Sequence, residues 1–151
     1  MAIYVSGVFC KEVLRERSPS GAELLSAIRI LDIVDVEIPT DTALTEGTVL
    51  GPAEFFLLAQ LRSDDPEEFE IELAAITPSG KQTRIQAFPS KLGGNVSGHA
   101  IIVTIKLNAA TEGNFWFEWR IKGELMLRMP LSIRHNKVPV QTETVSMEPS
   151  E

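Results

Sequence analysis

Cysteine is nearly absent from this chain of 151 residues, which contains only Cys10. A single cysteine cannot close a disulfide within the chain, so the fold must be held by packing, and this usage suits a reducing compartment. The N-terminal stretch MAIYVSGVFC has no Lys or Arg before its short apolar part, unlike a secretory signal. These two features predict a cytoplasmic protein.

Long apolar runs are also missing. The longest are about the length of a strand and are interrupted by charges, whereas a membrane-spanning helix needs about 20 apolar residues. We therefore expect no membrane association. Basic residues are scarce too, with 14 Lys and Arg against 21 Asp and Glu, so the formal net charge is −7. Such a chain repels phosphate backbones on average, which predicts no nucleic-acid partner, although a local basic patch stays open.

What the sequence does contain is alternation of apolar and polar residues, the mark of half-buried strands. Residues 53–62 are apolar on both sides and fit a central strand or a short helix, of which we favour the strand. The pattern predicts an all-β, antiparallel immunoglobulin-like β-sandwich of seven to eight strands over residues 1–135. Residues 136–151 are polar and predict a disordered tail. The expected strands are residues 3–14, 24–38, 53–62, 69–77, 81–88, 96–109, 115–121 and 125–133.

The last two expected strands form a hairpin. Within residues 115–121 and 125–133, every odd position holds an apolar residue. For the two sets to share one face, the connecting loop must contain an odd number of residues. A three-residue loop, residues 121–123, satisfies this, because its glycine can adopt the left-handed conformation of a bulge. This arrangement would place Trp119 opposite Leu125.

Three stretches resemble a family of small, uncharacterised bacterial proteins with immunoglobulin-like or C2-like sandwiches. They are residues 9–15 (FCKEVLR), residues 25–35 (LSAIRILDIVD) and residues 113–133, with a Gly-x-Phe start, a Gly turn and a Pro-Leu-x-Ile finish. The family often has Asp-Gly at the closing turn, where this chain has Lys122-Gly123. The resemblance implies a fold and carries over no activity and no site residue.

Few residues could support catalysis. A hydrolase-like enzyme could combine His99 with Cys10 or Ser97 as nucleophile and Asp32 as the acid. No nucleophile-elbow pattern surrounds the serine, and a histidine at the start of a strand is the simpler interpretation. Asp32 falls on an otherwise apolar strand face, so we expect a buried carboxylate with a structural partner. The enzyme built on His99 is therefore an alternative to a chain without catalytic residues.

An acidic turn offers a second alternative. Asp64, Asp65, Glu67 and Glu68 provide carboxylates like those at calcium-binding loop tips, but they lack the glycine and spacing of a calcium-loop motif. A module that binds calcium or a small ligand would use this turn together with residues 91–95. Two widely separated histidines do not make a zinc site, so we expect no metal and no cofactor.

The leading hypothesis rests on one surface of the closing hairpin. Trp116 is expected beside charged neighbours on the face opposite the apolar set, and Arg120, Arg128 and Arg134 share that face by parity. Tryptophan and arginine are typical anchors of protein interfaces. The sequence therefore predicts a non-enzymatic interaction or self-assembly module that binds a protein partner or a second copy through these four residues.

Overall fold

The computed structural model describes residues 3–21, 23–40, 52–64, 66–92, 98–108 and 110–139. These residues form strands arranged in two sheets, and no helix occurs among them. The all-β prediction is therefore confirmed, including a strand rather than a helix over residues 53–62. The strands are β1 (Ile3–Arg17), β2 (Glu23–Leu31), β3 (Ile33–Pro39), β4 (Pro52–Ser63), β5 (Glu67–Ile76), β6 (Gln82–Leu92), β7 (Gly98–Asn108), β8 (Gly113–Ile121) and β9 (Glu124–Val138).

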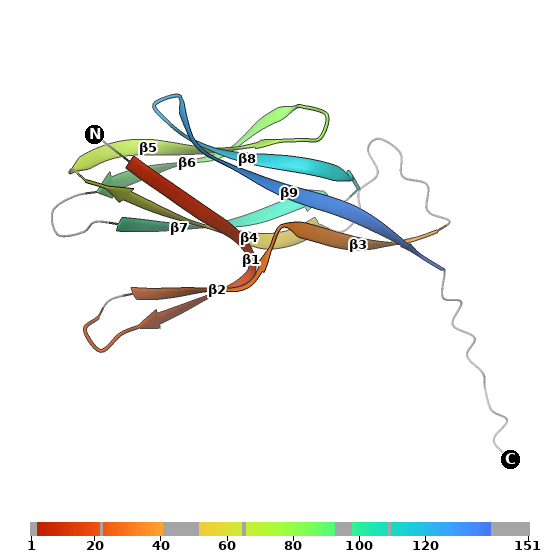
Figure 1. Ribbon diagram of the computed structural model, residues 1–151, viewed down its shortest axis with the longest axis horizontal. Coiled ribbons are helices and arrows are strands. Elements are labelled where there is room, and N and C mark those ends of the chain that lie inside the picture. Colours follow the sequence, from red (N-terminus) through yellow and green to blue (C-terminus); the bar gives the residue numbers. More distant parts are fainter. Residues whose placement is uncertain are drawn as a thin grey trace, which may run out of the picture.

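The two sheets pack face to face (Figure 1). The first sheet has the order β2-β1-β4-β7 and the second has the order β3-β9-β8-β5-β6. The described residues thus form nine strands rather than the predicted seven to eight. The sheets are also not wholly antiparallel, because β3 runs parallel to β9. The immunoglobulin-like assignment within this two-sheet class stays a prediction.

The additional strand arises where residues 24–38 were expected to form one strand. The chain instead leaves the first sheet after Leu31 and enters the second at Ile33. Asp32 lies in the bend between them and is exposed, while its backbone carbonyl accepts a hydrogen bond from the Ser132 N–H at 2.9 Å. The prediction of a buried Asp32 is therefore wrong, because a change of sheet removes the residue from any strand face.

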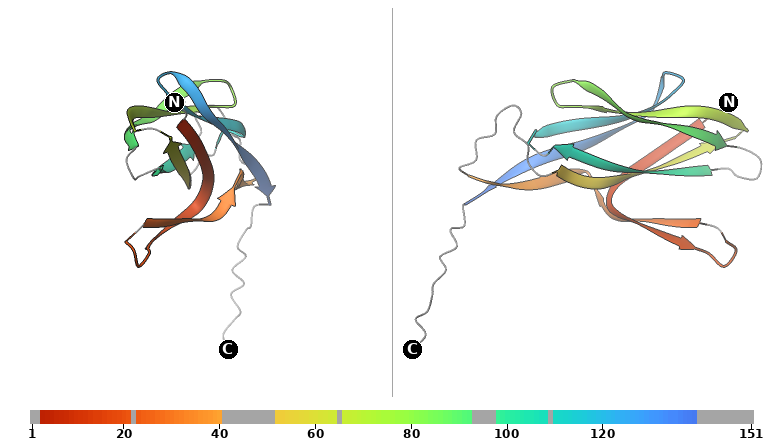
Figure 2. Two further views of the ribbon diagram at one scale, coloured as in Figure 1. Left: turned by 60° about the vertical axis from the view of Figure 1, so that its left-hand side comes forward. Right: turned by 180° about the vertical axis from the view of Figure 1, so that it is seen from behind.

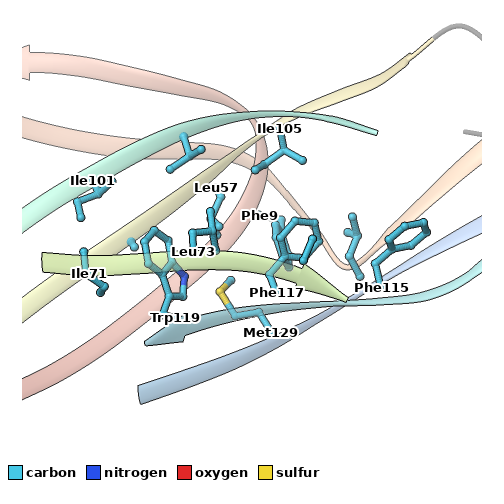
Figure 3. Packing of buried hydrophobic residues seen from close by; sticks show 14 of the residues in the cluster. Phe9, Leu57, Ile71, Leu73, Ile101, Ile105, Phe115, Phe117, Trp119 and Met129 are labelled. Atoms are coloured by element: carbon cyan, nitrogen blue, oxygen red, sulfur yellow. The ribbon is translucent and has the colours of Figure 1, made fainter. Parts of the chain in front are cut away.

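The core lies between the sheets and follows the alternation that the sequence shows (Figure 3). Three phenylalanines, one each from β1, β4 and β8, meet edge to face at its centre. The ring centroids of Phe9 and Phe117 are 5.1 Å apart, those of Phe9 and Phe55 5.7 Å, and those of Phe55 and Phe117 6.4 Å. Such edge contacts are favoured by the ring quadrupoles, so this cluster joins the first sheet to the second.

The closing hairpin differs from the predicted three-residue loop. Lys122 and Gly123 alone form the turn, with φ values of 51° and 77°. Two successive positive φ values are those of a type I′ turn, whose twist matches that of the flanking strands. The register then shifts between Trp119 and Arg120, so that Trp119 pairs with Leu127 and not with Leu125. A bulge in β9 thus keeps the apolar residues of both strands on one face, as the three-residue loop was predicted to do.

The first sheet extends beyond the body of the molecule. β1 pairs with β4 only as far as Cys10, while its pairing with β2 continues to Arg17. We name residues 11–21 and 23–30 the hairpin arm. It projects away from the two packed sheets in Figure 1 and in both views of Figure 2. Arg29 has a φ of 56°, and the register skips it, so a bulge-like irregularity stands where the arm leaves the body.

The arm exposes apolar side chains that the alternation of the sequence predicts to be buried. Leu24 is 51% exposed and Ile30 is 67% exposed, although both stand on the expected apolar face. In β3 the same alternation does bury Val34 and Ile38. The difference arises because β3 belongs to the second sheet, whose inner face packs against the first, whereas the arm lies outside the two-layer body.

At the other end, β9 continues to Val138, and residues 140–151 of the expected tail lie outside the described residues. The described residues contain no helix long and apolar enough to span a membrane.

Cys10 provides a chemical probe of the junction between arm and body. It is fully buried, and this desolvation raises the pKa of its thiol above the usual value. Because the thiolate is the reactive form, we expect alkylation of Cys10 by iodoacetamide to be slow in the folded protein and fast in urea. Mass spectrometry of quenched samples measures both rates. Equal rates with and without urea would show that the junction is open in the native state.

Candidate functional site

A cleft of about 1020 Å³ lies between the hairpin arm and the outer face of the first sheet. We name it the arm cleft. Its volume is at the upper end of the range for ligand-binding sites. Its lining comes from β1, β2, β4 and β7, and consists of Tyr4, Val5, Ser6, Arg15, Glu23, Leu25, Gln60, Leu61, Arg62, Gly98, His99, Ala100 and Ile102.

Cross-strand register organises the floor of the arm cleft. Tyr4 of β1 pairs with Arg62 of β4, and Arg62 pairs with Gly98 of β7. Directly opposed residues in antiparallel strands bring their side chains side by side on one face. Tyr4 is 58% exposed, so its side chain is open to solvent on the same sheet face as that of its cross-strand neighbour Arg62. The floor therefore presents one aromatic face next to one fixed positive charge.

The neighbouring cross-strand row of the floor contains two small residues, Ser6 and Ala100. Ser6 pairs with Gln60, and Gln60 pairs with Ala100. Gly98, at the end of the first row, contributes no side chain at all. Ser6, Gly98 and Ala100 thus leave space on the floor beside the longer side chains of Tyr4 and Arg62.

The hairpin arm supplies the opposite wall. Arg15 lines the cleft from β1 and Glu23 lines it from β2, with 3.7 Å between Arg15 Nη1 and Glu23 Oε1. Both side chains are more than half exposed. An exposed ion pair of this kind contributes about 0–1 kcal/mol, so Arg15 remains available to a stronger anion.

The charge of the arm cleft opposes that of the whole chain. Its described lining residues include two guanidiniums, those of Arg15 and Arg62, and one carboxylate, that of Glu23. The formal net charge of the chain is −7. Net charge is an average over the surface and hides such a local excess. Sequence reasoning missed this site because its aromatic and basic residues come from the two ends of β1 and from β4, which is distant in the sequence.

The four residues predicted as a partner surface lie elsewhere, along β8 and β9 on the outer face of the second sheet. Trp116 is half-buried, and the Arg128 guanidinium stacks 4.0 Å above its ring. Arg120 and Arg128 both contact the buried Glu118, at 3.1 and 3.7 Å. Arg134 is exposed further along β9. These contacts explain three of the residues by internal packing, and their role in binding stays a prediction.

The residues proposed for a hydrolase are not brought together as that hypothesis needs. His99 lines the arm cleft, but Cys10 and Asp32 do not. Cys10 is buried between β2 and β4, where it pairs with Ile30 and Phe56, and Asp32 is exposed at the change of sheet. Ser97 lies outside the described residues.

The acidic turn is used in ion pairs along β5. Glu67 Oε1 accepts a hydrogen bond from Lys122 Nζ at 3.0 Å, and Glu68 lies 3.4 Å from Lys91. Asp65 lies outside the described residues, as do residues 93–95 of the second suggested loop. In the part of the chain that the structure describes, no three His, Cys, Asp or Glu side chains gather in a metal-binding group.

Comparisons with known proteins give no family. No family model matches the chain, and no curated protein matches it. One solved structure that matches is the alkylpurine DNA glycosylase AlkC of Pseudomonas fluorescens bound to DNA containing an abasic-site analogue. The match has a TM-score of 0.47 and 12% identity, and covers 87% of this chain but only 30% of that one. A likeness at this level assigns no activity here, and the sequence resemblance stays a prediction.

The functional expectation from the sequence nevertheless needs correction. It predicts a protein-interaction or self-assembly module without nucleic acid, with a ligand or calcium module and a His99 hydrolase as alternatives. The matching structure is instead a DNA-bound DNA glycosylase, so this prediction and its exclusion of nucleic acid are wrong and are not carried further. Net charge describes the average surface, and it could not show that Arg15 and Arg62 line one cleft.

Proposed function

We propose that this domain binds a single strand of nucleic acid in the arm cleft. The observation that carries the proposal is the pairing of Tyr4 with Arg62 on the floor, opposite Arg15 on the arm. Proteins that bind single strands combine positive charge along the backbone with aromatic rings on which bases stack. The arm cleft places both elements within one concave surface.

Each residue has a distinct role in this proposal. The exposed Tyr4 ring is a platform for one unpaired base, and the guanidiniums of Arg62 and Arg15 bind phosphates on either side of it. Arginine suits this role because its planar fork donates two parallel hydrogen bonds to phosphate oxygens. A duplex keeps its bases stacked in pairs, so it cannot place a base on Tyr4. We therefore propose preference for single strands.

Fluorescence anisotropy with a labelled oligothymidine tests the stacking role. Base stacking on an aromatic side chain contributes about 1–3 kcal/mol, so Tyr4→Ala should weaken binding by about five- to 150-fold. Tyr4→Phe keeps the ring and should bind within about twofold of the wild type. Indistinguishable affinities for Tyr4→Ala and Tyr4→Phe would exclude stacking on this residue.

The salt dependence of the same titration tests the phosphate role. Each phosphate contact on a single strand contributes about 0.7 to the slope of log K against log salt, so Arg62→Ala should reduce that slope by about 0.7. Arg134→Ala removes the same charge from the second sheet, outside the arm cleft, and serves as the matched control. A slope that falls equally in both variants would indicate long-range attraction rather than a contact in the arm cleft.

A further inference from the structure

Glu23 stands out in the arm cleft because its charge opposes that of Arg15 and Arg62. Its Cα partner across the arm is Arg17, yet its carboxylate lies against Arg15, two residues along β1. Diagonal neighbours across two strands are within reach of long side chains. Glu23 therefore contacts the arginine that lines the cleft, and the carboxylate itself belongs to the lining.

The contact is close enough to compete with a ligand and weak enough to be displaced. The Arg15–Glu23 distance of 3.7 Å is longer than the roughly 2.7–2.9 Å of a charge-assisted hydrogen bond. The two side chains are 65% and 57% exposed, so water screens the pair. A phosphate with two free oxygens can form the closer bidentate contact with the same guanidinium.

We propose that Glu23 is an internal competitor that occupies Arg15 until a phosphate replaces it. This inference rests on the proposed binding of nucleic acid in the arm cleft. The exchange needs no covalent step, since one anion leaves the guanidinium and another takes its place. Glu23 then lowers the affinity of the arm cleft for isolated anions. A strand that is also held at Tyr4 and Arg62 brings its phosphate to Arg15 at a high effective concentration.

Glu23→Gln tests the competition, because it keeps the shape of the side chain and removes its charge. We expect this variant to bind labelled oligothymidine about two- to fivefold more tightly than the wild type, the range that an exposed ion pair allows. The matched control is Glu16→Gln. Glu16 is an exposed arm residue outside the cleft lining, paired with Leu24, and it carries the same charge. Its substitution should leave the affinity unchanged.

A second background separates competition for Arg15 from general repulsion of phosphate. In Arg15→Ala protein the competitor has no guanidinium to occupy, so Glu23→Gln should no longer tighten binding. Equal tightening with and without Arg15, or equal effects of Glu23→Gln and Glu16→Gln, would overturn the proposal. Circular dichroism and urea midpoints are measured for all variants, so that only folded proteins are compared.

The outcomes also separate this inference from the function on which it rests. If the wild type binds in a manner that depends on Tyr4 and Arg62 but Glu23→Gln changes nothing, only the competitor role is lost. If neither the wild type nor Glu23→Gln binds the oligonucleotide while both are folded, nucleic-acid binding in the arm cleft is itself wrong, and the competitor role falls with it.

Discussion

Phe117→Ala should lower the free energy of unfolding by about 3–5 kcal/mol, the range for deleting a buried aromatic side chain. Phe117 has no exposed surface and is the β8 member of the aromatic cluster that joins both sheets (Figure 3). The substitution removes its edge contacts with Phe9 and Phe55 and leaves a cavity between the sheets. Domains are stable by only about 5–15 kcal/mol, so this single change removes a large share.

Urea denaturation followed by tryptophan fluorescence measures the change, because the fully buried Trp119 lies on the same strand. Ile30→Ala is the matched control. Ile30 is 67% exposed on the hairpin arm, and surface substitutions usually change stability by no more than about 0.5 kcal/mol. Comparable losses in the two variants would contradict a core centred on Phe117, and would indicate that the arm face is covered in solution.

The body of the fold could be predicted from the sequence because a strand with one buried and one solvent-exposed face alternates apolar and polar residues. The inward-facing residues of β7 and β8 are buried at the odd positions that the pattern gives, as Val103 and Trp119 illustrate. Patterning depends only on which face is covered, so it does not need the order of strands in the sheets. Register and connectivity do depend on that order, and they were predicted less well.

The closing hairpin shows why register is harder to predict than alternation. A three-residue loop and a two-residue turn followed by a bulge both keep the apolar residues of β8 and β9 on one face. Parity therefore cannot distinguish them. The structure has the two-residue turn, with Lys122 and Gly123 in left-handed conformations and the register shift beyond Arg120. The preference of type I′ turns for glycine was the signal that could have favoured this solution.

The arm cleft could not be predicted from the sequence for a different reason. Tyr4, Arg15 and Arg62 line one cleft only because β4 pairs with β1 and because the arm leaves the body near Arg29. Neither the pairing of β4 with β1 nor the departure of the arm from the body has a local signature in the sequence. The alternation in β2 is that of a covered strand, although Ile30 is exposed. Alternation predicts a face, but the presence of a second layer decides whether that face is buried.

Glu118 lies on β8 opposite Arg128 of β9, and its burial leads to the second large effect. The residue is 5% exposed, and its two carboxylate oxygens face Arg120 at 3.1 Å and Arg128 at 3.7 Å. A buried charge is tolerated because it is paired, and removing the partners of a buried ion pair costs about 3–5 kcal/mol. We therefore expect the double substitution Arg120→Met/Arg128→Met to destabilise the domain by about this amount, although methionine retains the aliphatic packing.

Adding Glu118→Leu to the double variant separates charge from packing. The arginines also contact Trp116 and the Gly123 carbonyl, and those contacts stay lost in the triple variant. If the buried carboxylate causes the instability, its removal should recover most of the lost free energy, because well-packed apolar residues often replace a buried ion network at little cost. Urea midpoints of the three proteins measure the recovery. A triple variant as unstable as the double would show instead that the arginines stabilise β8 and β9 through Trp116 and the closing turn, with Glu118 playing no part.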